Sequence, residues 1–309
     1  MSVFLAASIL VCGLAVKVSY SQAPGVPADD WMRVQSDDGE FSVEVPAKYH
    51  FFYDEDGFSI SANFGDTTLK KMEMLNSYAG GALLSFERYL ASRDAVAAMA
   101  ESDHRRLGVI SSTSESRPSG TKYRQIVTKT EKFYSIRQYF YTKDHIYILT
   151  AASRDGDAPE MRRFLDSVDV RMRPPTSVRT DARTFSTLTR SSIVVEDLTG
   201  QPKTKPVPPP DGAKIVAPDP KDKPILIVTK PMASYTNLAR SSSVTGTAVV
   251  RVEFADDGWI PKLSFIKSLS GGLSRQVLMA ALRIKFLPAE KDGVPVKISR
   301  SVEYSFDVH

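Results

Sequence analysis

Side chains that could carry acid–base or metal chemistry are few in this sequence and widely spaced. The chain has 309 residues, with four histidines and one cysteine, Cys12. The histidines do not stand at metal-ligand spacings such as His-Glu-x-x-His; they are His50, His104, His145 and His309. The sequence therefore predicts no zinc site and no catalytic histidine pair.

Three short acidic runs are the remaining candidates for a cation site. They lie at 37–38, 54–56 and 155–157, and each contains or adjoins a glycine. None continues into the full set of oxygen ligands that a calcium loop needs. Aspartate beside glycine is typical of tight turns. We interpret all three runs as turns and expect no metal.

Nucleophile motifs are also missing from the sequence. There is no Gly-x-Ser-x-Gly elbow and no glycine-rich phosphate loop. The nearest serine candidate, Ser274, stands at the start of a predicted helix. The sequence thus predicts a protein that is not an enzyme and takes no cofactor. Its remaining chemistry is that of main-chain hydrogen-bonding groups, which depends on how strands are arranged.

Length and composition indicate a globular protein of two domains. Hydrophobic residues make up 42% of the chain and charged residues 25%, which is enough to bury a core in each half. The formal net charge of +4 is spread along the chain and not gathered into one basic stretch. We therefore expect no nucleic-acid binding.

The first 23 residues predict export. An apolar run over residues 3–16 includes Cys12 and is followed by Lys17 and small residues. This pattern is typical of a secretory signal peptide, and the run is shorter than the roughly 20 residues that cross a bilayer. We expect a periplasmic or cell-envelope protein, and the sequence leaves inner-membrane anchoring open.

Residues 24–172 predict an α/β sandwich-like domain. The patterns favour strands at 41–45, 58–64, 122–130, 133–142, 145–152 and 167–170, a long helix at 82–106 and a short helix at 159–164. The opening Glu40–Pro46 and the closing Phe164–Ser167 weakly resemble the PsbP/Mog1-like fold. A fold of this kind implies no activity.

Residues 173–223 predict a linker rich in proline and lysine. Ten of the 19 prolines fall between Arg171 and Pro224, with ten basic and six acidic residues. Such a composition favours an extended, semi-rigid chain over 201–224. Within this stretch, Ser191–Val195 could form a short strand.

Residues 224–309 predict a second domain in the order strand, strand, helix, strand. Alternating strands at 247–254 and 259–267 flank the turn Ala255–Gly258, a helix follows at 273–284, and a final strand runs over 294–306. We expect a small three-stranded antiparallel sheet with helices. The whole chain is therefore predicted to be α+β.

Six motifs, in order, give this second domain its resemblance to the TonB C-terminal domain of TonB-family energy transducers. They are Lys230-Pro231 with Tyr235 and Ala239-Arg240, then Val244–Val252, Asp257-Gly258, Ala280-Ala281 with Arg283, Lys285–Ala289, and Asp292–Val296. The resemblance implies a periplasmic module that binds partners and performs no chemistry.

Family members bind a peptide of an outer-membrane receptor by adding it as a strand along the last strand of the sheet. Carried over, the resemblance implies that 296–306 is the edge strand, with these partner-binding residues: Lys297, Ser299, Ser301, Glu303 and, nearby, Tyr235. It implies a TonB-dependent outer-membrane receptor as partner. Inner-membrane proton-driven motor proteins and a homodimer stay open as further partners.

Two functions follow from the sequence. The first is a periplasmic TonB-like protein that binds an outer-membrane receptor or another partner by β-strand addition and supports energy-dependent transmembrane transport. The alternative is a secreted binding or scaffold module with a TonB-like fold and no direct role in transport.

Overall fold

The structure is a computed structural model that describes residues 31–56, 58–62, 65–69, 71–90, 109–171, 181–200 and 222–307. The expected signal segment at 1–23 and most of the proline-rich stretch at 201–224 lie outside these residues. Within the described ranges, no helix has both the length and the apolar character needed to cross a membrane.

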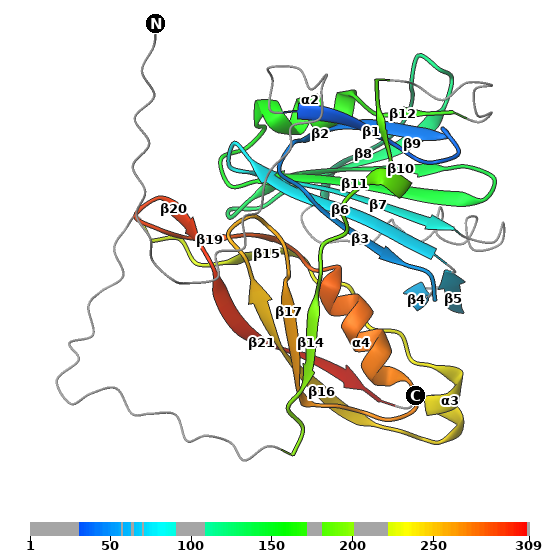
Figure 1. The fold of residues 1–309 in the computed structure, drawn as a ribbon, viewed down its shortest axis with the longest axis vertical. Helices are drawn as coiled ribbons and strands as arrows, with labels where there is room; N and C mark the ends of the chain where they lie inside the picture. The colour runs from blue at the N-terminus through cyan, green and yellow to red at the C-terminus, as the bar shows by residue number, and fades with distance from the viewer. Residues whose placement is uncertain are drawn as a thin grey trace, which may run out of the picture.

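The N-terminal part is a β-rich sandwich of two sheets (Figure 1). The smaller sheet has the order β12-β2-β1-β13, with β1 at Trp31–Gln35, β2 at Phe41–Pro46, β12 at Asp169–Val170 and β13 at Arg183–Thr184. The larger sheet has the order β3-β6-β7-β11-β10-β9-β8 and is antiparallel throughout. Its strands are β3 (His50–Asp54), β6 (Lys71–Ala79), β7 (Ala82–Leu90), β8 (Val109–Ser116), β9 (Lys122–Lys129), β10 (Tyr134–Tyr141) and β11 (His145–Ser153). A separate hairpin joins β4 (Phe58–Ala62) to β5 (Gly65–Leu69), and helix α2 (Pro159–Asp166) buries one side in the sandwich.

The C-terminal part is built on a second, four-stranded sheet of order β14-β17-β16-β21. These strands are β14 (Val194–Asp197), β16 (Gly246–Phe254), β17 (Lys262–Lys267) and β21 (Ile298–Phe306). Helix α4 (Leu273–Leu282) packs on this sheet, and a short helix α3 (Asn237–Ser241) precedes β16. Two small ladders complete it: β15 (Leu226–Thr229) with β18 (Lys285–Leu287), and β19 (Ala289–Lys291) with β20 (Val294–Val296).

The larger N-terminal sheet is the central layer of the molecule, because both of its faces are buried. One face packs on the smaller sheet through a core that includes Phe41, Phe86 and Phe164. Met74 and Tyr89 point to the other face, where they join one continuous core with the C-terminal part. The two parts therefore share buried apolar surface and are not joined by chain connectivity alone.

Residues 181–200, inside the predicted linker, form a folded strap between the two parts. β13 pairs in parallel with β1, and Phe185 is buried in the N-terminal core. Ser191 then donates its N–H to the Phe51 carbonyl at 2.8 Å. β14 continues the strap by pairing in parallel with β17. The short strand expected near Ser191–Val195 is thus present and lies on the C-terminal sheet.

The helix predicted at 82–106 is wrong for its first nine residues, which form β7. β7 lies between β6 and β11 and is buried on both faces, so its sequence lacks the two-residue alternation of a half-buried strand. Gly80 and Gly81 carried the correct signal, because a Gly-Gly pair with φ of 57° and 77° forms a two-residue hairpin turn. Residues 91–106 of the predicted helix lie outside the described ranges.

Two further expectations are corrected. The N-terminal part is β-rich, and α2 is a minor element, so it is a β-sandwich rather than an α/β one. The C-terminal sheet has four strands and not three, because β14 adds a parallel strand. The final strand predicted at 294–306 is also divided, since the turn at Asp292-Gly293 folds β20 back onto β19 before β21 begins.

Candidate functional site

β21 is an edge strand whose outer side faces away from the sheet. The strand order places it at one end, next to β16 only. The Glu303 carbonyl accepts a hydrogen bond from Lys230, which lies beyond that edge. Main-chain groups of alternate residues point to the same side of a strand. The outward groups are therefore those of Ser299, Ser301, Glu303 and Ser305.

The structure places most of the sequence-predicted residues along this edge. Ser299, Ser301 and Glu303 are exposed, and each combines an outward main chain with a side chain on the solvent face of the sheet. Lys297 just precedes β21 and forms an ion pair with Glu253 at 3.2 Å. The edge is therefore polar, with hydroxyl groups at Ser299, Ser301 and Ser305 and a carboxylate at Glu303.

Tyr235 lies at the far end of β21 and has a packing role. Its ring meets that of Phe306 edge-on, with centroids 5.8 Å apart. Its hydroxyl donates to the Val244 carbonyl at 2.5 Å. Tyr235 thus holds the segment before α3 against the end of β21, and it is not grouped with Ser299 and Ser301.

The sequence reading missed Lys230 as a residue of this edge. Its Nζ lies 2.7 Å from the Glu303 carbonyl oxygen and 4.8 Å from the centroid of the Tyr304 ring. Lys230 belongs to one of the quoted TonB-like motifs, but its position 73 residues before Glu303 gives no local signal for the contact. Only the tertiary fold brings the two together.

The opposite edge of the same sheet is formed by β14, which pairs with β17. Val194 donates its N–H to the Pro261 carbonyl at 2.9 Å, and Leu198 donates to the Phe265 carbonyl at 2.8 Å. The ion pair between Glu196 and Lys262, at 2.6 Å, adds a side-chain tie. The chain therefore supplies its own strand to one edge and leaves β21 at the other.

The face of the C-terminal part that meets the N-terminal sheet carries a buried ionic cluster. Glu87 of β7 lies 3.5 Å from Arg283 Nε and 3.3 Å from Lys285 Nζ. Arg283 Nε also donates to the Tyr89 hydroxyl at 2.8 Å, and Lys285 Nζ donates to Asn76 Oδ1 at 3.3 Å. Glu87 and Lys285 are buried and the Arg283 side chain is 12% exposed, so the cluster lies between the two parts with little access to solvent.

Burial and charge oppose each other in this cluster. Burial raises the pKa of the Glu87 carboxyl, but Lys285 and Arg283 together outweigh burial and hold that pKa below its usual value. Burial lowers the pKa of Lys285, an effect that Glu87 opposes. The charged Glu87 is thus stabilised by cations from the other part, so the cluster ties the two together.

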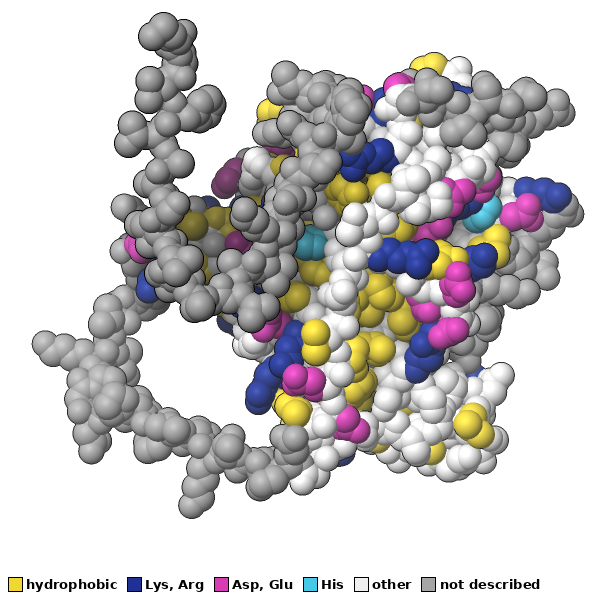
Figure 2. Space-filling model, viewed as in Figure 1, with side chains coloured by type: hydrophobic (Ala, Val, Ile, Leu, Met, Phe, Trp, Pro, Cys, Tyr) yellow, Lys and Arg dark blue, Asp and Glu magenta, His cyan; other side chains and the backbone are white. Residues whose placement is uncertain are grey.

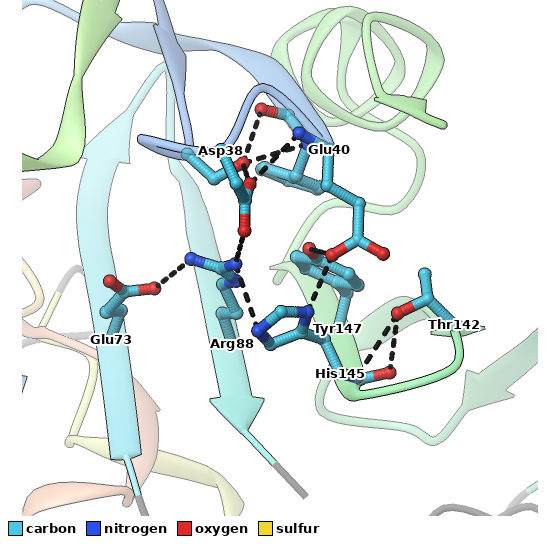
Figure 3. A network of polar contacts seen from close by, with 9 residues as sticks. Asp38, Glu40, Glu73, Arg88, Thr142, His145 and Tyr147 are labelled. Atoms are coloured by element: carbon cyan, nitrogen blue, oxygen red, sulfur yellow. Dashed lines mark hydrogen bonds and ion pairs between the residues drawn. The ribbon is translucent and has the colours of Figure 1, made fainter. Parts of the chain in front are cut away.

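A second polar network lies within the N-terminal sandwich (Figure 3). Arg88 donates to Asp38, to Glu73 at 3.1 Å and to His145 Nε2 at 3.0 Å. His145 Nδ1 in turn donates to Glu40 at 2.6 Å. These partners assign a neutral imidazole, because Nε2 must accept while Nδ1 donates.

Asp38, Glu40 and His145 are the one set of potential metal ligands that converges among the described residues, with ligand atoms within 4.8 Å of one another. Arg88 already supplies the positive charge there and occupies His145 Nε2. Burial lowers the pKa of Arg88, but Tyr147, Glu73 and Asp38 outweigh burial and raise that pKa above its already high usual value. Arg88 therefore stands where a cation would balance the two carboxylates.

A junction of three segments surrounds His50. Its ring stacks on Trp259, with centroids 5.2 Å apart, while Nε2 contacts Asp257 at 2.6 Å and Nδ1 contacts Ser191 at 3.0 Å. Burial raises the pKa of Asp257, but hydrogen bonding and charge from His50 outweigh it and hold the pKa below its usual range. β3, the strap and the β16–β17 turn thus meet at one residue.

Positive and negative side chains are interspersed on the face of the molecule shown in Figure 2. That view shows no single field of lysine and arginine side chains. It agrees with the even charge distribution of the sequence.

Comparison with known proteins gives a family match for the C-terminal part only. No curated protein matches the chain. Among solved structures, the chain is similar to the solution structure of cyanobacterial PsbP (CyanoP) from Synechocystis sp. PCC 6803, at 8% identity and a TM-score of 0.29, over 49% of this chain and 98% of that one. That degree of similarity transfers neither fold nor function. Residues 231–308, by contrast, match the family model of the Gram-negative bacterial TonB protein C-terminal, which confirms the TonB-like resemblance for this part of the chain.

Proposed function

We propose that this protein is a periplasmic TonB-like protein whose C-terminal part binds a partner by β-strand addition along β21, in support of energy-dependent transmembrane transport. The partner is an extended peptide of an outer-membrane receptor. The N-terminal sandwich is an accessory docking unit, and the partner-binding residues are Ser299, Ser301 and Glu303, with Lys297 and Tyr235 at the two ends.

The observation that carries this proposal is the outward main chain of β21. A strand at the end of a sheet presents N–H and C=O groups to which a peptide can pair, and exposed side chains beside them tune which peptide pairs. The match of residues 231–308 to the TonB C-terminal model supports a receptor peptide as the class of partner. β14, at the other end of the sheet, has four residues and β21 has nine, so β21 offers the longer edge for pairing.

Site-specific photo-crosslinking in a Gram-negative host tests the proposal. A photoreactive residue replaces Ser301, and a matched variant carries it at Glu196, on β14 at the opposite edge of the same sheet. We expect Ser301 to crosslink to the periplasmic N-terminal segment of an outer-membrane receptor, whereas Glu196 does not. Equal crosslinking from both positions would contradict strand addition at β21.

The alternative, a secreted binding module without a role in transport, uses the same edge with a different partner. Crosslinking from Ser301 to a soluble envelope protein, with no receptor among the products, would select this alternative. That result would support strand addition at β21 and would contradict the role in transport.

A further inference from the structure

Lys230 closes part of the edge at which a partner strand would pair. Its ammonium lies 2.7 Å from the outward carbonyl of Glu303. A strand added along Ser299–Ser305 needs that oxygen as an acceptor for one of its own N–H groups. The ammonium and the incoming N–H therefore compete for the same approach to Glu303.

The position of Lys230 is fixed by its neighbour Thr229, the last residue of β15. Thr229 pairs with Lys285 of β18, and its hydroxyl accepts a hydrogen bond from Arg137 of β10. Arg137 is buried in the N-terminal sheet. The N-terminal sandwich thus anchors the residue that precedes Lys230. This anchor restricts the movement of the Lys230 backbone relative to β21.

We propose that Lys230 guards the β21 edge, so that two copies of the chain do not pair through it and a partner strand must displace the ammonium to pair along the full strand. Lysine beside an exposed edge is a recognised protection against edge-to-edge association, because pairing would bury or displace its charge. The guard selects for a partner whose main chain offers an N–H, and not a proline, opposite Glu303. This proposal rests on β21 being the binding edge.

Self-association of the full chain tests the guard without a known partner. Lys230→Met removes the ammonium but keeps an unbranched apolar side chain over the Tyr304 ring. When two copies of this variant pair antiparallel through β21, the Glu303 carbonyl of each copy is free to accept a hydrogen bond. Each of these two carbonyls should raise the association constant about threefold, so sedimentation velocity should show self-association about tenfold tighter than wild type. Lys267→Met, at an exposed lysine that ends β17, should match wild type.

A double variant identifies the surface used. Adding Ser301→Pro to Lys230→Met removes an N–H that faces outward, so it blocks pairing at the edge while leaving the bonds to β16 in place. The double variant should return to wild-type self-association. If it associates as strongly as Lys230→Met, or if Lys230→Met associates no more than wild type, the guard is overturned.

The two proposals fail separately. Unchanged self-association of Lys230→Met, together with receptor crosslinking from Ser301, removes the guard and keeps the binding edge. Loss of that crosslinking, with tighter self-association of Lys230→Met, keeps the guard on an edge whose partner is not a receptor.

Discussion

The face of the C-terminal part that packs on the larger N-terminal sheet, the docked face, contrasts with the β21 edge in how its polar groups are satisfied. On the docked face, the buried Glu87 and Lys285 meet Arg283, whose side chain is 12% exposed, and apolar residues of both parts surround them. On the edge, Ser299 and Ser301 are exposed and their main-chain groups point outward. A buried charge that loses its partner is costly, whereas an exposed hydroxyl exchanges its partner for water. The contrast teaches that the docked face holds the molecule together, and the edge is the side able to take a new partner.

The largest expected effect comes from breaking the buried cluster. Glu87→Ala leaves Arg283 and Lys285 buried without their anion, and we expect the free energy of unfolding to fall by about 3–5 kcal/mol. Chemical denaturation measures this loss. Glu303→Ala, an exposed carboxylate on β21, is the matched control and should change stability by no more than about 0.5 kcal/mol.

A triple variant sharpens the same point. Replacing Glu87, Arg283 and Lys285 together by Leu, Leu and Met removes every charge of the cluster at once, so no ion is left buried alone. We expect it to recover most of the stability lost in Glu87→Ala. A triple variant as unstable as the single one would show that packing, and not the unpaired cations, causes the loss.

Gly258→Ala should have an intermediate effect on the docked face. Gly258 has φ of 79°, and an added Cβ would lie 3.3 Å from Leu83 Cδ1 of β7. The positive φ and the close approach should together cost about 1–2 kcal/mol, measured by denaturation. Gly293→Ala, where φ is 78° but no atom lies within 4 Å, isolates the backbone contribution and should cost less.

The junction at His50 should make part of the stability depend on pH. The pKa of Asp257 is lower in the folded protein than in the unfolded chain, where it is about 3.9. Between these two pKa values the unfolded state therefore binds more protons than the folded state. The stabilisation is fully present above the unfolded-state pKa and is lost as the pH falls through the folded-state pKa. Asp257→Asn should therefore flatten the stability curve below about pH 4. The exposed neighbour Asp256→Asn should keep the slope of the wild type.

The smallest effect is expected on the open edge. Ser299→Ala removes an exposed hydroxyl from β21 and should leave the free energy of unfolding within about 0.5 kcal/mol of wild type. Thermal unfolding checks this. A loss above 1 kcal/mol would mean that the edge contributes to the fold and is not free to change partners.

The C-terminal elements were predictable because their signals are local. The hairpin at Asp257-Gly258, the helix from Leu273 and the alternating final strand each follow from turn chemistry or periodicity within about ten residues. The edge residues Ser299 and Ser301 came from the resemblance to the TonB C-terminal domain and not from the alternation alone. Their role as a binding site stays a proposal.

The rest was hidden because it depends on contacts far apart in the sequence. β7 reads as a helix since burial on both faces removes its alternation, a burial that only the docked C-terminal part explains. The addition of β14 to β17 and the contact of Lys230 with Glu303 join segments 68 or more residues apart. No local pattern specifies either contact.

Residue-resolved amide hydrogen exchange of the full-length protein tests the central contrast most directly. If β21 is open on its outer side, the amides of Ser299, Ser301, Glu303 and Ser305 exchange fast, while those of Arg300, Val302 and Tyr304, which face β16, are protected. Uniform protection along β21 would show that its outer side is already covered and would contradict the account.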